Sequence, residues 1–136
     1  MRTLRKTEDD RVSFIMAGLD PAHHEAARGL VYTEHADGFA KSFPVDSPHL
    51  DQIYDNFSRH AGAMVLQAAH AIPIPWQEAL AAFLRRVDGQ GIDWYLVGSA
   101  ALAVRGMPVT PGDLDLVTDG PGAHQLADLL ADQLVE

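Results

Sequence analysis

The chain has 136 residues, enough for one compact domain with a substantial core. Its net charge of −9 disfavours a nucleic-acid partner, because phosphate backbones are usually contacted by basic surfaces. It has no cysteine, which excludes disulfides, thiolate metal sites and a thiol nucleophile, and no signal peptide or membrane-spanning run is seen. The composition therefore predicts a cytoplasmic globular protein without a membrane partner.

The N-terminal segment, residues 1–46, is predicted to be partly helical. Residues 1–19 are ambiguous, because the stretch VSFIMAGL fits either a short strand or a helical turn. Asp20 and Pro21 suit an N-cap and a first helical residue, so we expect a helix that continues to about Phe39.

Residues 47–90 predict two amphipathic helices. The first starts near Ser47, and its apolar residues recur at intervals of three and four: Leu50, Ile53, Tyr54, Phe57, Ala61, Met64, Val65 and Ala68. Pro75 starts the second helix, which the DGQG stretch ends. Its apolar stripe consists of Trp76, Ala79, Leu80, Phe83, Leu84 and Val87. This region could wall a substrate pocket or cover the open face of a sheet, and the sequence does not choose between them.

Residues 91–136 have a different sequence pattern, in which short apolar strands alternate with short helices. The stretch DWYLVG predicts a strand, SAALAVRG a helix, DLDLVTD a second strand, and Pro121 the start of a helix that runs to the C-terminus. The predicted fold class is α/β (α+β), with a helical N-terminal region followed by a strand–helix–strand–helix core with a short mixed sheet. We expect the three segments to form one compact domain.

Asp113 and Asp115 are unusual residues for a strand that otherwise reads as buried. Alternate strand residues share a face, so the two carboxylates would project together while Leu114 and Leu116 face a core. Two like charges so close repel unless a cation lies between them, and magnesium is the usual cation where phosphates complete its shell. The alternative is a solvated edge strand whose acids discourage aggregation.

Gly98 and Ser99 follow the preceding strand and supply a complementary feature. A glycine that lets another backbone approach, followed by a helix start, presents backbone N–H groups and the Ser99 hydroxyl to an anion. If the two strands are neighbours, phosphates at this turn lie within reach of a metal at the two aspartates. Taken alone, the Gly-Ser pair reads as an ordinary strand-to-helix turn.

Two further groups of residues bear on a possible site, the aromatic pair Trp94 and Tyr95 and the histidines. One of Trp94 and Tyr95 must face away from the core side of its strand, where it could border a nucleotide pocket. The seven histidines are scattered without a pair at ligand spacing, which disfavours a histidine metal site.

The order of apolar strand, Gly-Ser, short helix and Asp-apolar-Asp resembles the nucleotidyltransferase superfamily, whose fold is shared with DNA polymerase β. The helix SAALAVRG is most similar to small bacterial members, including those that adenylylate aminoglycoside or lincosamide antibiotics. The match covers about residues 92–136. The resemblance implies two magnesium ions and transfer of a nucleoside monophosphate from an NTP to a hydroxyl of a small molecule or protein.

Carried over to this chain, the resemblance gives Asp113 and Asp115 the catalytic metal-binding role. Gly98 and Ser99 would contact the triphosphate, and Arg105 is a weaker candidate for a phosphate contact, since it also suits a solvated helix end.

The chain also departs from the family pattern. Members usually carry a third carboxylate on a later strand, and many have an arginine four residues before the first aspartate, where this chain has Val109. These departures predict a truncated piece of a longer protein or a reduced member. A missing strand would expose a sheet edge and favour a homodimer. Two other functions stay open: a non-catalytic interaction protein of the same fold, like some toxin–antitoxin components, and a helical partner-binding module.

Overall fold

The computed structural model describes residues 1–135, which form two compact units. The first unit comprises Met1–Pro73 together with the last described residues from Asp132 onward, and the second comprises Ile74–Ala131. The division falls between the two long helices, whereas the sequence suggested segment boundaries near residues 46 and 90. Both units combine helices with antiparallel strands, so the mixed α+β class is confirmed.

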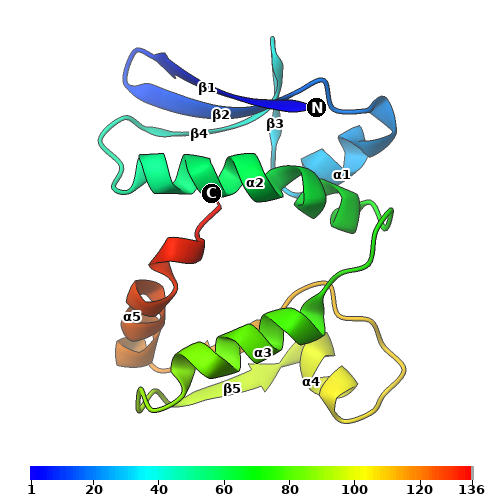
Figure 1. Cartoon of the computed structure of the whole chain (residues 1–136), viewed down its shortest axis with the longest axis vertical. Helices are drawn as coiled ribbons and strands as arrows, with labels where there is room; N and C mark the ends of the chain where they lie inside the picture. Colours follow the sequence, from blue (N-terminus) through cyan, green and yellow to red (C-terminus); the bar gives the residue numbers. More distant parts are fainter. Residues whose placement is uncertain (136) are drawn as a thin grey trace. The chain divides into compact units, whose positions relative to one another are not determined.

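The first unit contains a four-stranded antiparallel sheet in the order β1-β2-β4-β3 (Figure 1). Its elements are β1 (Arg2–Glu8), β2 (Arg11–Ala17), η1 (Pro21–His23), α1 (His24–Gly29), β3 (Thr33–His35), β4 (Gly38–Pro44) and α2 (Leu50–Ala68). The expected helix up to Phe39 is therefore wrong beyond Gly29, and the N-terminal region is built mainly of strands. The ambiguous first 19 residues form the β1–β2 hairpin.

Two backbone features explain why the predicted N-terminal helix stops early. Val31 has a φ of +67°, which turns the chain out of the helical region directly after α1. Gly38 has a φ of +148°, and a Cβ at this position would collide with the backbone of Met16 on the neighbouring β2. The chain can make this close approach only with glycine, and it returns as β4 instead of continuing a helix.

The sheet and α2 enclose the core of the first unit (Figure 1). The buried core residues are Val12, Phe14, Met16, Ala27, Tyr32, Phe39, Leu50, Ile53, Phe57, Ala61 and Val65. Those from β2 alternate along the strand, and those from α2 recur at helical spacing, as the two periodicities require. The apolar stripe predicted for α2 is confirmed at most of its positions, although the helix begins at Leu50 rather than near Ser47.

One buried residue of α2 is polar. Asn56 is 6% exposed, and its amide nitrogen donates to the carbonyl oxygens of Asp132 and Leu134, each at 2.8 Å. Its amide oxygen accepts from Arg59 at 3.1 Å. Val135 packs against the same core. The last described residues are thus held against α2 by a buried, fully used side-chain amide.

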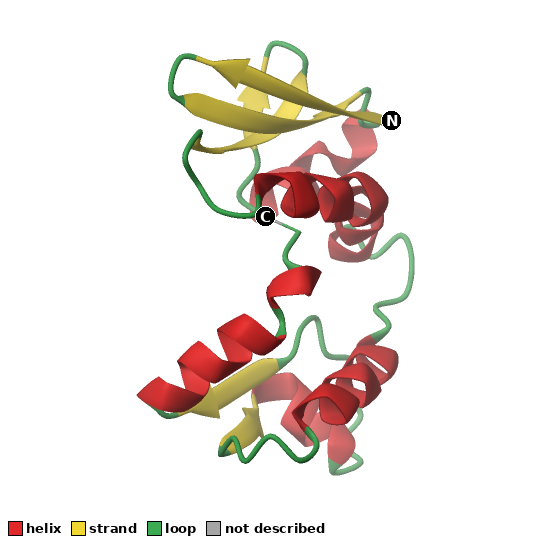
Figure 2. Ribbon diagram, turned by 60° about the vertical axis from the view of Figure 1, so that its left-hand side comes forward, coloured by secondary structure: helices red, strands yellow, loops and turns green. Residues whose placement is uncertain are grey.

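The second unit has a two-stranded antiparallel sheet and three α-helices among its described residues (Figures 1 and 2). Its elements are α3 (Trp76–Val87), β5 (Trp94–Val97), α4 (Gly98–Val104), β6 (Asp115–Thr118) and α5 (Gly120–Leu129), and η2 (Ala131–Gln133) follows. The predicted strand–helix–strand–helix order is confirmed. The element boundaries differ by one or two residues at most positions, and the largest difference is at the last α-helix, which ends at Leu129 instead of continuing to the C-terminus. β6 begins at Asp115 instead of Asp113.

The core of the second unit lies on one face of the β5–β6 sheet. Phe83 and Val87 of α3 pack with Leu126 of α5, and the ring of Trp94 meets that of Phe83 edge-on at 5.0 Å and 83°. At the start of α5, the carboxylate of Asp119 accepts a hydrogen bond from the backbone N–H of Gly122 at 2.7 Å. Asp119 is therefore an N-cap, which occupies its carboxylate in holding the helix start.

Candidate functional site

The Gly-Ser turn and the Asp-Leu-Asp segment are neighbours in the structure. β5 pairs with β6, and Val97 lies directly opposite Asp115. The next residue, Gly98, has a φ of +68°, and a Cβ placed on it would lie 2.7 Å from Oδ2 of Asp115. The two strands are therefore neighbours, which the sequence alone could not establish. Their pairing brings the Asp115 carboxylate against the backbone of the Gly98 turn.

The two aspartates do not occupy equivalent positions. Asp115 is the first residue of β6, whereas Asp113 lies in a bend before the strand. The strand alternation expected to place both carboxylates on one face therefore holds only from Asp115 onward. Buried Pro111 precedes this bend, and a proline cannot donate to a sheet ladder, which is a physical reason for a late strand start. Both carboxylates belong to exposed residues.

Ser99 and Arg105 lie at opposite ends of α4. Ser99 is half-buried in the first turn, next to Gly98, whereas Arg105 is the exposed C-cap residue. Seven helical residues separate the ends by about 10 Å at the standard rise. The structure thus brings together Gly98, Ser99 and Asp115, and it leaves Arg105 at the far end of the helix.

One face of the β5–β6 sheet is open in the described part of the chain. Register places Tyr95 opposite Val117 and Val97 opposite Asp115, so these four residues share a face. Trp94 and Leu96 alternate to the other face, where the helices pack. Tyr95 is 71% exposed. Of the two aromatic residues that the sequence could not separate, Tyr95 is the one on the face that carries Asp115.

The second unit offers few side chains that could coordinate a magnesium ion. Residues 1–135 contain no group of three or more histidine, aspartate or glutamate side chains arranged to hold a metal. Asp115 beside the Gly98 turn, with exposed Asp113 two residues earlier in the chain, nevertheless suits magnesium, which is commonly held by one or two carboxylates plus substrate phosphates and water. The residues present therefore fit a metal that arrives with a nucleotide, and they do not fit a metal held by protein ligands alone.

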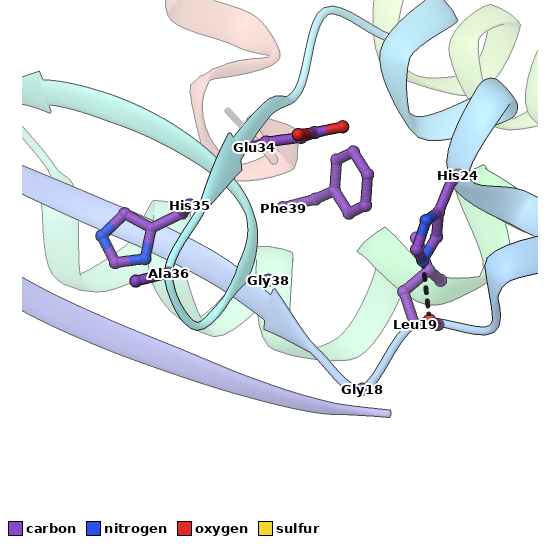
Figure 3. Close-up of a pocket in the computed structure, with 8 residues that line it drawn as sticks. All are labelled: Gly18, Leu19, His24, Glu34, His35, Ala36, Gly38 and Phe39. Atoms are coloured by element: carbon purple, nitrogen blue, oxygen red, sulfur yellow. Dashed lines mark hydrogen bonds between the residues drawn. The ribbon is translucent and has the colours of Figure 1, made fainter.

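A separate hollow lies in the first unit (Figure 3). It has a volume of about 410 Å³ and is lined by Gly18, Leu19, His24, Glu34, His35, Ala36, Gly38 and Phe39. The rings of His24 and Phe39 lie 4.7 Å apart, and His24 Nε2 is 3.0 Å from the carbonyl oxygen of Leu19. No sequence pattern marks this hollow, because its lining residues come from two separate segments, Gly18 to His24 and the β3–β4 hairpin, that only the folded chain brings together.

The polar groups of this hollow are engaged elsewhere. Figure 3 shows His35 on the opposite side of the hairpin from His24, so the two imidazoles do not converge. The Glu34 carboxylate accepts from Arg28 at 2.6 Å, and this hydrogen bond lowers the pKa of Glu34. The hollow contains none of the residues that the sequence singled out.

Comparison of the chain with protein-family models, curated proteins and solved structures found no match. The resemblance to the nucleotidyltransferase superfamily therefore rests on the sequence motif alone. Within residues 1–135, no helix combines the length and the apolar character that crossing a bilayer requires.

Proposed function

We propose that this chain is a nucleotidyltransferase-fold protein that binds a magnesium–nucleoside triphosphate at Gly98, Ser99, Asp113 and Asp115. The observation that carries the proposal is the close approach of Gly98 to Asp115. This approach puts a carboxylate beside the glycine turn, and metal-assisted phosphate chemistry needs a carboxylate that can hold the metal close to the bound phosphates.

In this proposal, Asp115 and Asp113 hold magnesium, and the Ser99 hydroxyl donates to a phosphate oxygen. Magnesium would neutralise phosphate charge while a hydroxyl of a small molecule or protein attacks the α-phosphorus and pyrophosphate leaves. A general base for that hydroxyl is not among the proposed site residues. A third carboxylate, from a further segment or from a partner chain, would complete the site.

The test is calorimetric titration of each NTP into the full chain, first with magnesium and then with EDTA. We expect magnesium-dependent binding that falls at least about tenfold in the Asp113→Asn, Asp115→Asn double variant, because both metal ligands lose their charge. Asp128→Asn is the matched control, since it removes an exposed carboxylate from α5 at no site residue. Arg105→Ala tests the weaker phosphate candidate and should reduce affinity least.

Two results would contradict the proposal. One is an absence of magnesium-dependent binding in the parent chain, and the other is an unchanged affinity in the double variant. Circular dichroism on each variant separates loss of binding from loss of fold.

A second function is favoured by a different observation. The β5–β6 sheet has only two strands in the described chain, and Leu102, Val104, Met107, Val109 and Val117 are exposed around it. Unpaired edges beside apolar side chains suit pairing with a strand of another chain. A non-catalytic interaction protein, or a homodimer formed through this edge, would account for them. Sedimentation of the purified chain tests self-association, which a monomer at all concentrations would contradict.

A further inference from the structure

Tyr95 has the position and the chemistry of a ligand-contacting residue. It lies on β5 directly opposite Val117 of β6, on the face of the sheet that also carries Val97 and Asp115. Along β5 it is two residues from Val97, the partner of Asp115, which corresponds to about 7 Å at the usual strand rise.

The side chain of Tyr95 is not needed to fill the core. The core of the second unit is formed on the opposite face, by Trp94 together with Phe83 and Leu126 among others. Tyr95 is 71% exposed, while Val117 and Val97 beside it are 50% and 36% exposed. An aromatic ring flanked by two half-exposed valines gives this face a flat, apolar floor next to a carboxylate.

A flat aromatic ring is suited to a flat ligand. Nucleobases stack on tyrosine, and this stacking tolerates any base because every base has a π-face. A nucleotide could place its phosphates at Gly98 and Asp115 and direct its base along β5 toward Tyr95. It would then contact the polar end and the aromatic end of the surface at once. The floor is made of Tyr95, Val97 and Val117, and the Tyr95 hydroxyl is its one side-chain hydrogen-bonding group, at the edge of the ring rather than on its face, so the floor offers little that reads the edges of a stacked base.

We propose that Tyr95 holds the nucleobase by stacking, and that the second unit consequently binds nucleoside triphosphates with little discrimination between bases. This inference rests on the function proposed above, because it takes the phosphates to lie at Gly98 and Asp115. It adds the residue that binds the base and the breadth of the substrate class.

The experiment separates the base from the phosphates. Magnesium complexes of ATP, CTP and inorganic tripolyphosphate are titrated into the full chain and into Tyr95→Ala, Tyr95→Phe and the control Leu84→Ala. Leu84 is an exposed residue of α3 and makes no part of the floor. The fluorescence of Trp76 and Trp94, neither of which belongs to the floor, reports whether each variant retains its fold.

We expect Tyr95→Ala to weaken ATP binding by about 5- to 150-fold, the range that loss of one stacked base produces, and to leave tripolyphosphate binding unchanged. Tyr95→Phe should keep the affinity of the parent, because the ring remains. ATP and CTP should bind the parent with similar affinities, with ATP tighter because a purine offers the larger stacking surface.

The opposite results overturn the inference in distinguishable ways. If the parent binds ATP and Tyr95→Ala binds it equally well, stacking is wrong while the proposed function stands. Equal weakening of ATP and tripolyphosphate in Tyr95→Ala would also refute it, as would a parent that binds one base and rejects the others. A parent that binds neither ATP nor tripolyphosphate removes the proposed function and this inference together.

Discussion

Gly98 and Asp115 approach so closely that a methyl group on Gly98 would lie 2.7 Å from Oδ2 of Asp115. This relationship joins the residue after β5 to the first residue of β6. Gly98 has a φ of +68°, a conformation that side-chain-bearing residues rarely adopt, so the backbone itself selects glycine here, while the exposed carboxylate of Asp115 could rotate away from an added methyl group.

Replacing Gly98 with alanine should destabilise the second unit. We expect a loss of about 1–3 kcal/mol from the left-handed backbone, and little more from the contact with Asp115, because its exposed carboxylate can rotate away. Gly91→Ala is the matched control, since Gly91 has a similar φ of +66° but no atom within 4 Å of an added Cβ. Urea unfolding followed by the fluorescence of Trp76 and Trp94, both in the second unit, measures the two losses. A much larger loss at Gly98 than at Gly91 would show that the Asp115 carboxylate cannot move aside.

Replacing Asn56 with leucine should loosen the last described residues. The variant leaves the carbonyl oxygens of Asp132 and Leu134 without their donor, and an unmet buried group costs about 1–3 kcal/mol. Hydrogen–deuterium exchange should rise across residues 132–135. Gln52→Ala, at an exposed position of α2, is the control and should change neither quantity. Unchanged exchange in the leucine variant would mean that apolar packing of this segment suffices.

Replacing Phe57 with alanine should be among the most destabilising single changes in the first unit. The ring is fully buried and packs near those of Phe14 and Tyr32. Removing a buried phenylalanine typically costs about 3–5 kcal/mol, because burial is lost and a cavity is left. His60→Ala, three residues along the same helix and exposed, should stay within about 0.5 kcal/mol of the parent. Thermal and urea unfolding of both variants measure the loss in the free energy of unfolding. A small loss in Phe57→Ala would contradict the central place of this ring in the core.

The ion pair between Lys6 and Asp37 should make stability depend on acidity. The hydrogen bond from Lys6 lowers the pKa of Asp37, and the charges of Lys6, His35 and Arg2 act in the same direction against partial burial. A lowered pKa stabilises the fold above the ordinary aspartate value of about 3.9, and this contribution is lost as the pH falls through the folded-state pKa.

The measurement is an NMR titration of the Asp37 carboxyl in the parent and in Lys6→Met. We expect the Asp37 pKa to rise toward its ordinary value in the variant, and the variant to lose less stability than the parent between neutral pH and about pH 3. Asp37→Asn, which removes the titrating group, should show the same reduced dependence. A Lys6→Met variant with an unshifted Asp37 pKa would exclude the ion pair as the cause.

The sequence could predict the helices whose apolar faces are long and regular. The periodicity from Leu50 to Val65 and the proline at position 75 located α2 and α3 to within a few residues. It could not predict the N-terminal sheet, because RTLRKTE has no strong alternation and its pairing with β2 is what makes it a strand. The expected helix also ran across the β3–β4 hairpin, in which His35 pairs with Gly38 around a two-residue turn.

For the candidate site, the sequence by itself determined the residue types: a glycine and a serine at a strand end, and two carboxylates one residue apart. Only the tertiary structure decided that Gly98 lies against Asp115, that Asp113 stands outside the strand, and that Arg105 is at the far end of α4. It also decided that Tyr95 rather than Trp94 faces outward, because strand register follows from which side chains can be buried together, and Trp94 packs against Phe83. Local patterns fix what a segment can become, while the choice of its partner is a property of the whole packed chain.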